Sequence, residues 1–143
     1  IRKETLRQRV RRDSLRADVR TMRERMRKEL DKSDPDWFDL KQGVGGIGDI
    51  EFLVQYLVLA TAETHPAVVH YPDNIRQLAT LAAAGCLEET LAQRLQDIYR
   101  GYRLRLHHLT LNEQKPLVPQ AEFAAERADV GAAWKQQLGV DTA

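Results

Sequence analysis

Apolar residues recur at helical spacing along most of this chain, and no pair of alternating strands accompanies them. Between Lys3 and Lys32 there is no glycine or proline, and apolar residues follow one another after three, four or five positions. This stripe consists of Leu6, Val10, Leu15, Val19, Met22, Met26 and Leu30. Residues spaced in this way share one face of a helix. The pattern therefore predicts one long helix, which ends before Pro35 because a proline disfavours helical geometry in the residue preceding it.

Four shorter segments with the same periodicity follow. We expect them from Ile50 to about Glu63, from Asp73 or Asn74 to Gly85, from Leu87 to Leu111, and from beyond Pro119 to Gly139. Asp49 is a good N-cap for the first of these, and Asp73 or Asn74 for the second. Residues 37–41 are expected to form a short extended segment. The prediction is an all-α fold: a bundle of about five helices in a single domain, residues 1–143.

The most unusual stretch is the glycine-rich loop before the second helix, Gly43 to Gly48. Its glycines satisfy the spacing G-x-G-x-x-G, which cradles a pyrophosphate in dinucleotide-binding folds. That fold needs a buried strand before the loop and a strand–helix–strand unit around it, whereas a long basic helix precedes it here. Two interpretations stay open. The loop amides, helped by Lys41, could approach an anion, or the glycines merely permit a tight turn.

Few other residues suggest chemistry. Asp49 and Glu51 could hold a magnesium ion with a nucleotide's phosphates if the segment were extended, but they diverge on a helix, where Asp49 would serve as a cap. His107 and His108 also diverge on a helix and cannot chelate one metal together. Cys86 has no adjacent base and is expected to be a packing residue. We therefore predict no metal site and no catalytic residue in this chain.

Composition narrows the class of protein. Of 143 residues, 43% are hydrophobic and 30% charged, which is typical of a globular domain. No apolar run approaches the roughly 20 residues that span a bilayer, so no membrane association is expected. A single cysteine agrees with a reducing, cytoplasmic environment. Because the first residue is Ile1, we interpret the chain as a fragment of a longer protein.

Charge is divided unevenly along the chain. Residues 1–32 contain 13 Lys and Arg against 6 Asp and Glu, a balance of +7, and the remainder carries 22 − 13 = 9 basic and 21 − 6 = 15 acidic residues, a balance of −6. The arginines surround the predicted first helix, and no aromatic residues are interleaved to stack on bases. A solvated helix, or one docked on an acidic neighbouring domain, is therefore favoured over a nucleic-acid binder.

A family resemblance rests on residues 38–55. They read FDLKQGVGGIGDIEFLVQ and resemble the signature F-D-L-K-x-x-x-G-G-I-x-D-I-E-F-x-x-Q of bacterial glutamine synthetase adenylyltransferases, which PII uridylyltransferases share in a looser form. Later landmarks extend the resemblance over about the whole chain. They include Asp73-Asn74-Ile75-Arg76, Leu106-His107-His108-Leu109 and Trp134.

The resemblance implies a bifunctional enzyme with two nucleotidyltransferase halves, each followed by a helical domain. One half transfers AMP from ATP, with Mg, to a tyrosine of glutamine synthetase, and the other removes it by phosphorolysis, under control of glutamine and the PII signal protein. This chain would be the C-terminal helical domain of the adenylylating half, inactive without the missing nucleotidyltransferase domain and its catalytic aspartates.

The residues that match the family motif are Lys41, Gly45, Gly46, Asp49 and Glu51. We expect them to form one wall of the nucleotide site, with Lys41 near the phosphates. The alternative is a regulatory or interaction module that binds glutamine, PII protein or glutamine synthetase.

Overall fold

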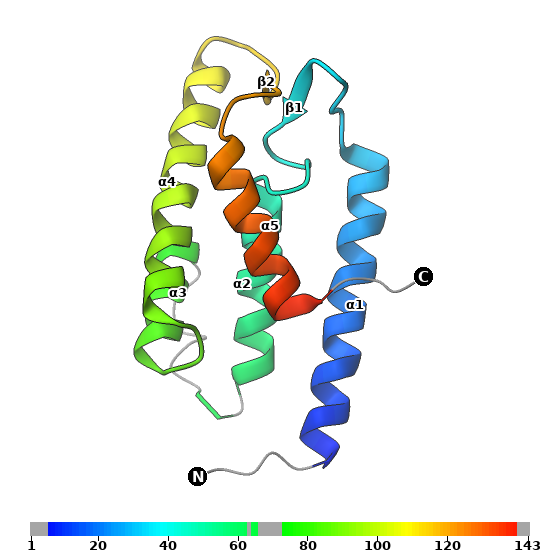
Figure 1. Ribbon diagram of the computed structural model, residues 1–143, viewed down its shortest axis with the longest axis vertical. Coiled ribbons are helices and arrows are strands. Elements are labelled where there is room, and N and C mark those ends of the chain that lie inside the picture. Colours follow the sequence, from blue (N-terminus) through cyan, green and yellow to red (C-terminus); the bar gives the residue numbers. More distant parts are fainter. Residues whose placement is uncertain (1–5, 63, 66–72, 140–143) are drawn as a thin grey trace.

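The computed structural model describes residues 6–62, 64–65 and 73–139, and five helices carry its architecture (Figure 1). The elements in chain order are α1 (Leu6–Leu30), β1 (Trp37–Asp39), α2 (Ile47–Thr61), α3 (Asn74–Ala83), α4 (Glu89–Leu111), β2 (Leu117–Pro119) and α5 (Ala124–Leu138). Helix α2 contacts each of the other four helices, with α1 on one side of it and α3 and α4 on the other. The predicted all-α bundle is confirmed. None of the described helices is both long and apolar enough to cross a membrane.

Helix α2 is central because its sequence is apolar around most of its circumference. Ile50, Leu53 and Val54 are fully buried, and Leu57 and Val58 nearly so. A helix that is apolar on nearly all sides must be surrounded by other elements, and the neighbouring helices supply that environment. The glycine-rich loop leads directly into this helix, so the loop is fixed at the start of the helix that all the others contact.

The start of α2 differs from the prediction. The helix begins at Ile47, and its N-cap is Gly46 in an extended conformation without a side-chain cap. Asp49 lies in the first turn, where its carboxylate accepts hydrogen bonds from Arg23 and Arg27 and from the Gly45 amide. The expectation that Asp49 caps this helix is wrong, because the two arginines of α1 draw its carboxylate inward. The expected end, Glu63, lies outside the described residues.

The other predicted helix ends are close to the observed ones. Asp73 caps α3, and its side chain accepts a hydrogen bond from the Ile75 amide at 2.9 Å. Gly85 follows α3 and Gly139 caps α5, each with φ of 78°, a conformation that glycine adopts without strain.

Helix α1 is where the hydrophobic pattern predicts burial least well. The expected start at Lys3 lies outside the described residues. In the stripe only Val19 is buried, whereas Leu6 and Val10 are 73% and 60% exposed. Arg23, by contrast, is completely buried. Figure 1 shows that the start of α1 extends beyond the ends of α2 and α5. In the second half, Met22 and Leu30 are also 62% and 45% exposed, so the buried face of α1 does not follow the apolar stripe.

A short antiparallel ladder joins two loops that are far apart in sequence. β1 pairs with β2 in the register Trp37↔Pro119, Phe38↔Val118 and Asp39↔Leu117. The sequence predicts an extended segment at residues 37–41, of which residues 37–39 form β1. It does not predict the partner strand, because β2 has only three residues and ends in a proline, which sheets tolerate only at an edge. The ladder ties the α1–α2 connection to the α4–α5 connection.

Candidate functional site

The glycine-rich loop is a closely packed turn. A Cβ atom on Gly45 would lie 2.5 Å from the Arg127 carbonyl oxygen, and one on Gly46 would lie 2.5 Å from that of Leu40. Gly45 also has φ of +84°. These approaches require glycine, because any side chain would meet backbone that has little room to move.

The loop amides point into the protein. The Gly45 amide donates to the Asp49 carboxylate at 2.8 Å, and those of Gly46 and Gly48 donate to the carbonyls of Gly43 and Lys41 at 3.0 Å. An anion cradle needs backbone amides that face a ligand. The tight-turn interpretation of the glycines is therefore the one that this geometry favours.

Beneath the loop lies a buried ionic network. Arg23 Nε is 2.7 Å from Asp49 Oδ1, and an Arg27 guanidinium nitrogen is 2.5 Å from the same oxygen. The Arg23 guanidinium also donates to Gln42 Oε1 at 2.8 Å and to the Gln42 carbonyl at 3.2 Å. Because both Asp49 oxygens are bonded inside the protein, Asp49 does not face a ligand. Its role is to join α1 to the loop.

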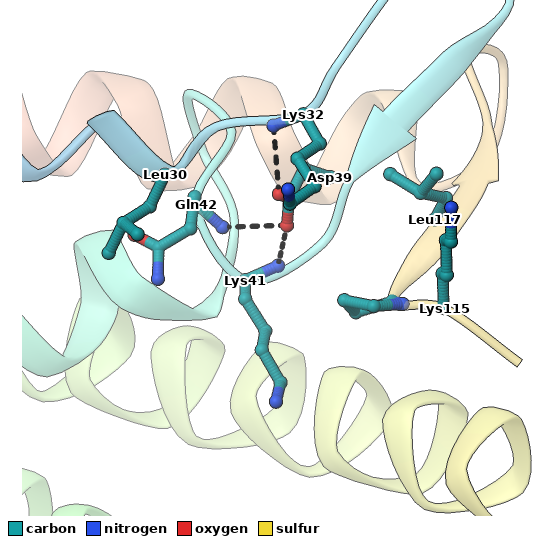
Figure 2. Close-up of a pocket in the computed structure, with 8 residues that line it drawn as sticks. Leu30, Lys32, Asp39, Lys41, Gln42, Lys115 and Leu117 are labelled. Carbon is teal, nitrogen blue, oxygen red and sulfur yellow. Dashed lines mark hydrogen bonds between the residues drawn. The ribbon is translucent and has the colours of Figure 1, made fainter. Parts of the chain in front are cut away.

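Asp39 forms a second anchor, which sequence reasoning did not single out. One of its oxygens accepts from the amides of Lys41 and Gln42 at 3.0 Å, and the other accepts from the Lys32 amide at 3.1 Å (Figure 2). An aspartate that follows an extended segment and bonds amides two and three residues later is a common turn device. It fixes the backbone on either side of Lys41.

Lys41 is exposed and points away from these anchors toward α4 (Figure 2). Its side chain lines three neighbouring cavities of about 310, 550 and 380 Å³. Glu51 lines the last of these together with Tyr99 and Arg103. Of the five predicted site residues, the structure thus brings Lys41 and Glu51 to one cavity and places Gly45, Gly46 and Asp49 behind it.

The tyrosines of α4 support the site from the opposite side. The Tyr102 hydroxyl donates to the Gly45 carbonyl at 2.8 Å, and burial raises the pKa of Tyr102. The Tyr99 hydroxyl donates to Glu51 at 3.4 Å and accepts from Asn74 at 3.1 Å, and burial raises its pKa as well. Both hydroxyls stay protonated near neutral pH and act as donors that hold the loop and Glu51.

The remaining candidates take no part in this site. Cys86 is half-buried, its sulfur lies 3.5 Å from His65 Nδ1, and burial raises the pKa of its thiol, which disfavours the nucleophilic thiolate. His107 and His108 are exposed on α4. Within the described residues, no group of three or more His, Cys, Asp or Glu side chains could hold a metal ion.

Comparison with known proteins places these features in a family context. Residues 13–130 match the family model of the GlnD PII-uridylyltransferases. A protein of Thioalkalivibrio sulfidiphilus is 50% identical over 127 residues, which cover 89% of this chain and 13% of that protein. Proteins of Nitrosococcus oceani and Methylococcus capsulatus are each 48% identical, over 90% and 85% of this chain and 13% of their own lengths. All three are named bifunctional glutamine synthetase adenylyltransferase/adenylyl-removing enzyme. The chain therefore spans about an eighth of the length of these relatives.

Proposed function

Because the chain belongs to the GlnD PII-uridylyltransferase family, we propose that it is a helical domain of a bifunctional glutamine synthetase adenylyltransferase/adenylyl-removing enzyme. The observation that carries this proposal is the 48–50% identity to enzymes of that name over 85–90% of the chain. The domain would belong to the adenylylating half, which moves AMP from ATP to a tyrosine of glutamine synthetase in the cytoplasm. PII protein and glutamine would regulate it, and the chain alone would be inactive.

Within this function, the glycine-rich loop would close one wall of the nucleotide site in the full-length enzyme. Lys41 supports this role because its ammonium group is exposed on an anchored backbone, where it could meet a phosphate. Asp49 and Glu51 do not fit a magnesium pair, since both oxygens of Asp49 are bonded internally and Glu51 accepts from Tyr99. Any magnesium ligands would thus come from the nucleotidyltransferase domain, and Gly45, Gly46 and Asp49 would hold the wall in place.

The test is the Lys41→Ala substitution in the full-length enzyme. Loss of a charge-assisted contact to a phosphate costs about 1.5 kcal/mol, so we expect the KM for ATP to rise, or kcat to fall, by about tenfold. Lys135→Ala is the matched control, because Lys135 is exposed in the last turn of α5. If both parameters of Lys41→Ala equalled those of the control, the loop would be a structural hinge.

A second candidate function, an interaction module, is favoured by the exposed first half of α1. Leu6 and Val10 lie there among arginines, an arrangement suited to an acidic protein surface with apolar positions. Titration of this chain with ATP–Mg, glutamine and PII protein separates the two roles. Binding of PII or glutamine without nucleotide binding would favour the interaction module.

A further inference from the structure

A small pocket opens beside Asp39, between the end of α1, residues 41–42 before the glycine-rich loop, and the segment that enters β2 (Figure 2). Its volume is about 310 Å³. Leu30, Pro116 and Leu117 supply apolar walls, and Lys32, Lys41 and Lys115 also line the pocket. The pocket therefore combines an apolar interior with a basic rim.

The basic charge of this rim is not neutralised by the carboxylate that lies within it. Asp39 is buried, and both of its carboxylate oxygens accept hydrogen bonds from the backbone amides of residues 32, 41 and 42. Among the described residues, no carboxylate forms an ion pair with Lys32, Lys41 or Lys115. No ion pair among the described residues thus neutralises these three ammonium groups.

Three separate segments meet at this pocket because of the β1–β2 ladder. Asp39 pairs with Leu117, and the Leu40 amide donates to the Pro116 carbonyl at 2.9 Å. These backbone bonds bring Lys115 next to residues that lie more than seventy positions earlier in the chain. The position of Lys115 at the pocket is therefore fixed by backbone hydrogen bonds of the neighbouring residues.

We propose that this pocket binds a small organic anion, whose apolar body lies against Leu30, Pro116 and Leu117 and whose carboxylate or phosphate lies at the lysine rim. A volume near 310 Å³ falls at the lower end of small-molecule sites. A peptide ligand would need a longer groove than the eight residues that line this pocket provide. The inference does not depend on the proposed function, because it concerns binding by this chain itself.

The experiment uses amide chemical-shift mapping and calorimetry on the chain, with phenyl phosphate and 3-phenylpropionate as probes. At least one of them should shift the amides of Lys32, Lys41 and Leu117. Benzyl alcohol, which lacks the charge, and inorganic phosphate, which lacks the apolar body, should bind at least tenfold more weakly. The stronger of the two organic anions identifies whether phosphate or carboxylate is the preferred group.

The double variant Lys41→Gln/Lys115→Gln should weaken the preferred probe at least tenfold, while Lys135→Gln should bind like the wild type. The variants are compared only after thermal unfolding shows that they fold. The shift mapping on the wild-type chain tests the proposal even if they do not.

The proposal is overturned if neither organic anion binds, if the shifts fall elsewhere, or if the double variant binds normally. It is also overturned if inorganic phosphate binds as tightly as phenyl phosphate. If both the KM for ATP and kcat of the Lys41→Ala enzyme were unchanged, the nucleotide-site wall would be refuted and this inference would still stand.

Discussion

Asp49 illustrates how a single side chain organises the candidate site. Its two oxygens bind Arg23, Arg27 and the Gly45 amide, so one carboxylate joins α1, α2 and the loop. The sequence singles out Asp49 as a cap of the second helix and, through the family motif, as part of a nucleotide-site wall. Its partner could not be recognised, because Arg23 is one of many arginines in α1 and only the packed structure shows which of them is buried.

Replacing Asp49 by Asn should destabilise the domain strongly. The change leaves Arg23, which is completely buried, without its counter-charge. Removing one partner of a buried ion pair costs about 3–5 kcal/mol, and urea unfolding monitored by circular dichroism measures the loss. Asp97→Asn is the control, because Asp97 pairs with Arg100 on the surface, where such a pair is worth about 0–1 kcal/mol. Equal losses in the two variants would refute the importance of the buried network.

Two glycine-to-alanine changes should have opposite signs. Gly46→Ala places a Cβ atom 2.5 Å from the Leu40 carbonyl oxygen, and we expect a loss of about 1–3 kcal/mol from overpacking. Gly101 lies within α4 and has open space around its missing Cβ, so Gly101→Ala should stabilise by about 0.5–1 kcal/mol. Thermal unfolding of both variants gives the comparison, and a stabilised Gly46→Ala would contradict the packed-turn description.

Tyr102 should make stability fall at alkaline pH. Burial raises its folded-state pKa, whereas an unfolded tyrosine titrates near pH ~10. Above that pH the unfolded state loses the proton while the folded state keeps it, so the free energy of unfolding decreases as pH rises. Tyr102→Phe should be less stable than the wild type at pH 7, because it loses the bond to Gly45, and should decline less between pH 9 and about 11. A parallel decline of the two proteins in urea titrations would exclude this origin.

At the scale of elements, α1 shows both the reach and the limit of hydrophobic periodicity. The spacing predicts a helix, and Leu6–Leu30 is one. The same spacing predicts a buried stripe along the whole helix, but Val19 is buried beside Arg23, whereas Met22 and Leu30 are exposed. Helicity depends on local sequence, but burial depends on where the neighbouring helices lie, and periodicity contains no information about that.

The two halves of α1 should therefore differ in hydrogen exchange. Residues 19–27 include Val19 and Arg23, which are buried against the body, whereas residues 8–14 are mostly exposed. Amides of a helix segment without buried contacts open more readily. We expect faster exchange in residues 8–14 than in residues 19–27, measured by NMR. Equal protection along the helix would indicate that another surface covers its first half.

For the whole molecule, sequence alone could predict the class of fold and the location of the candidate site, but not how the site is assembled. Five helices are predicted by hydrophobic periodicity and turn residues, and the glycine-rich loop stands out because four of its six residues are glycine. Val118 and Pro119, however, carry no signal of a strand, because three residues are too few to alternate. The pocket that both Lys41 and Lys115 line depends on that unforeseen ladder and could not be anticipated.

The anchoring of Lys41 has a further consequence for how this surface would respond to ligands. The Lys41 amide donates a hydrogen bond to the Asp39 carboxylate, and the Lys41 carbonyl accepts one from the Gly48 amide, so the backbone at Lys41 is fixed. The Lys41 side chain is exposed and borders three cavities. Reaching any of them requires a change of rotamer and no movement of the chain, at an entropic cost of at most about 2 kcal/mol. The Lys41 side chain could thus contact ligands in each of the three cavities in turn.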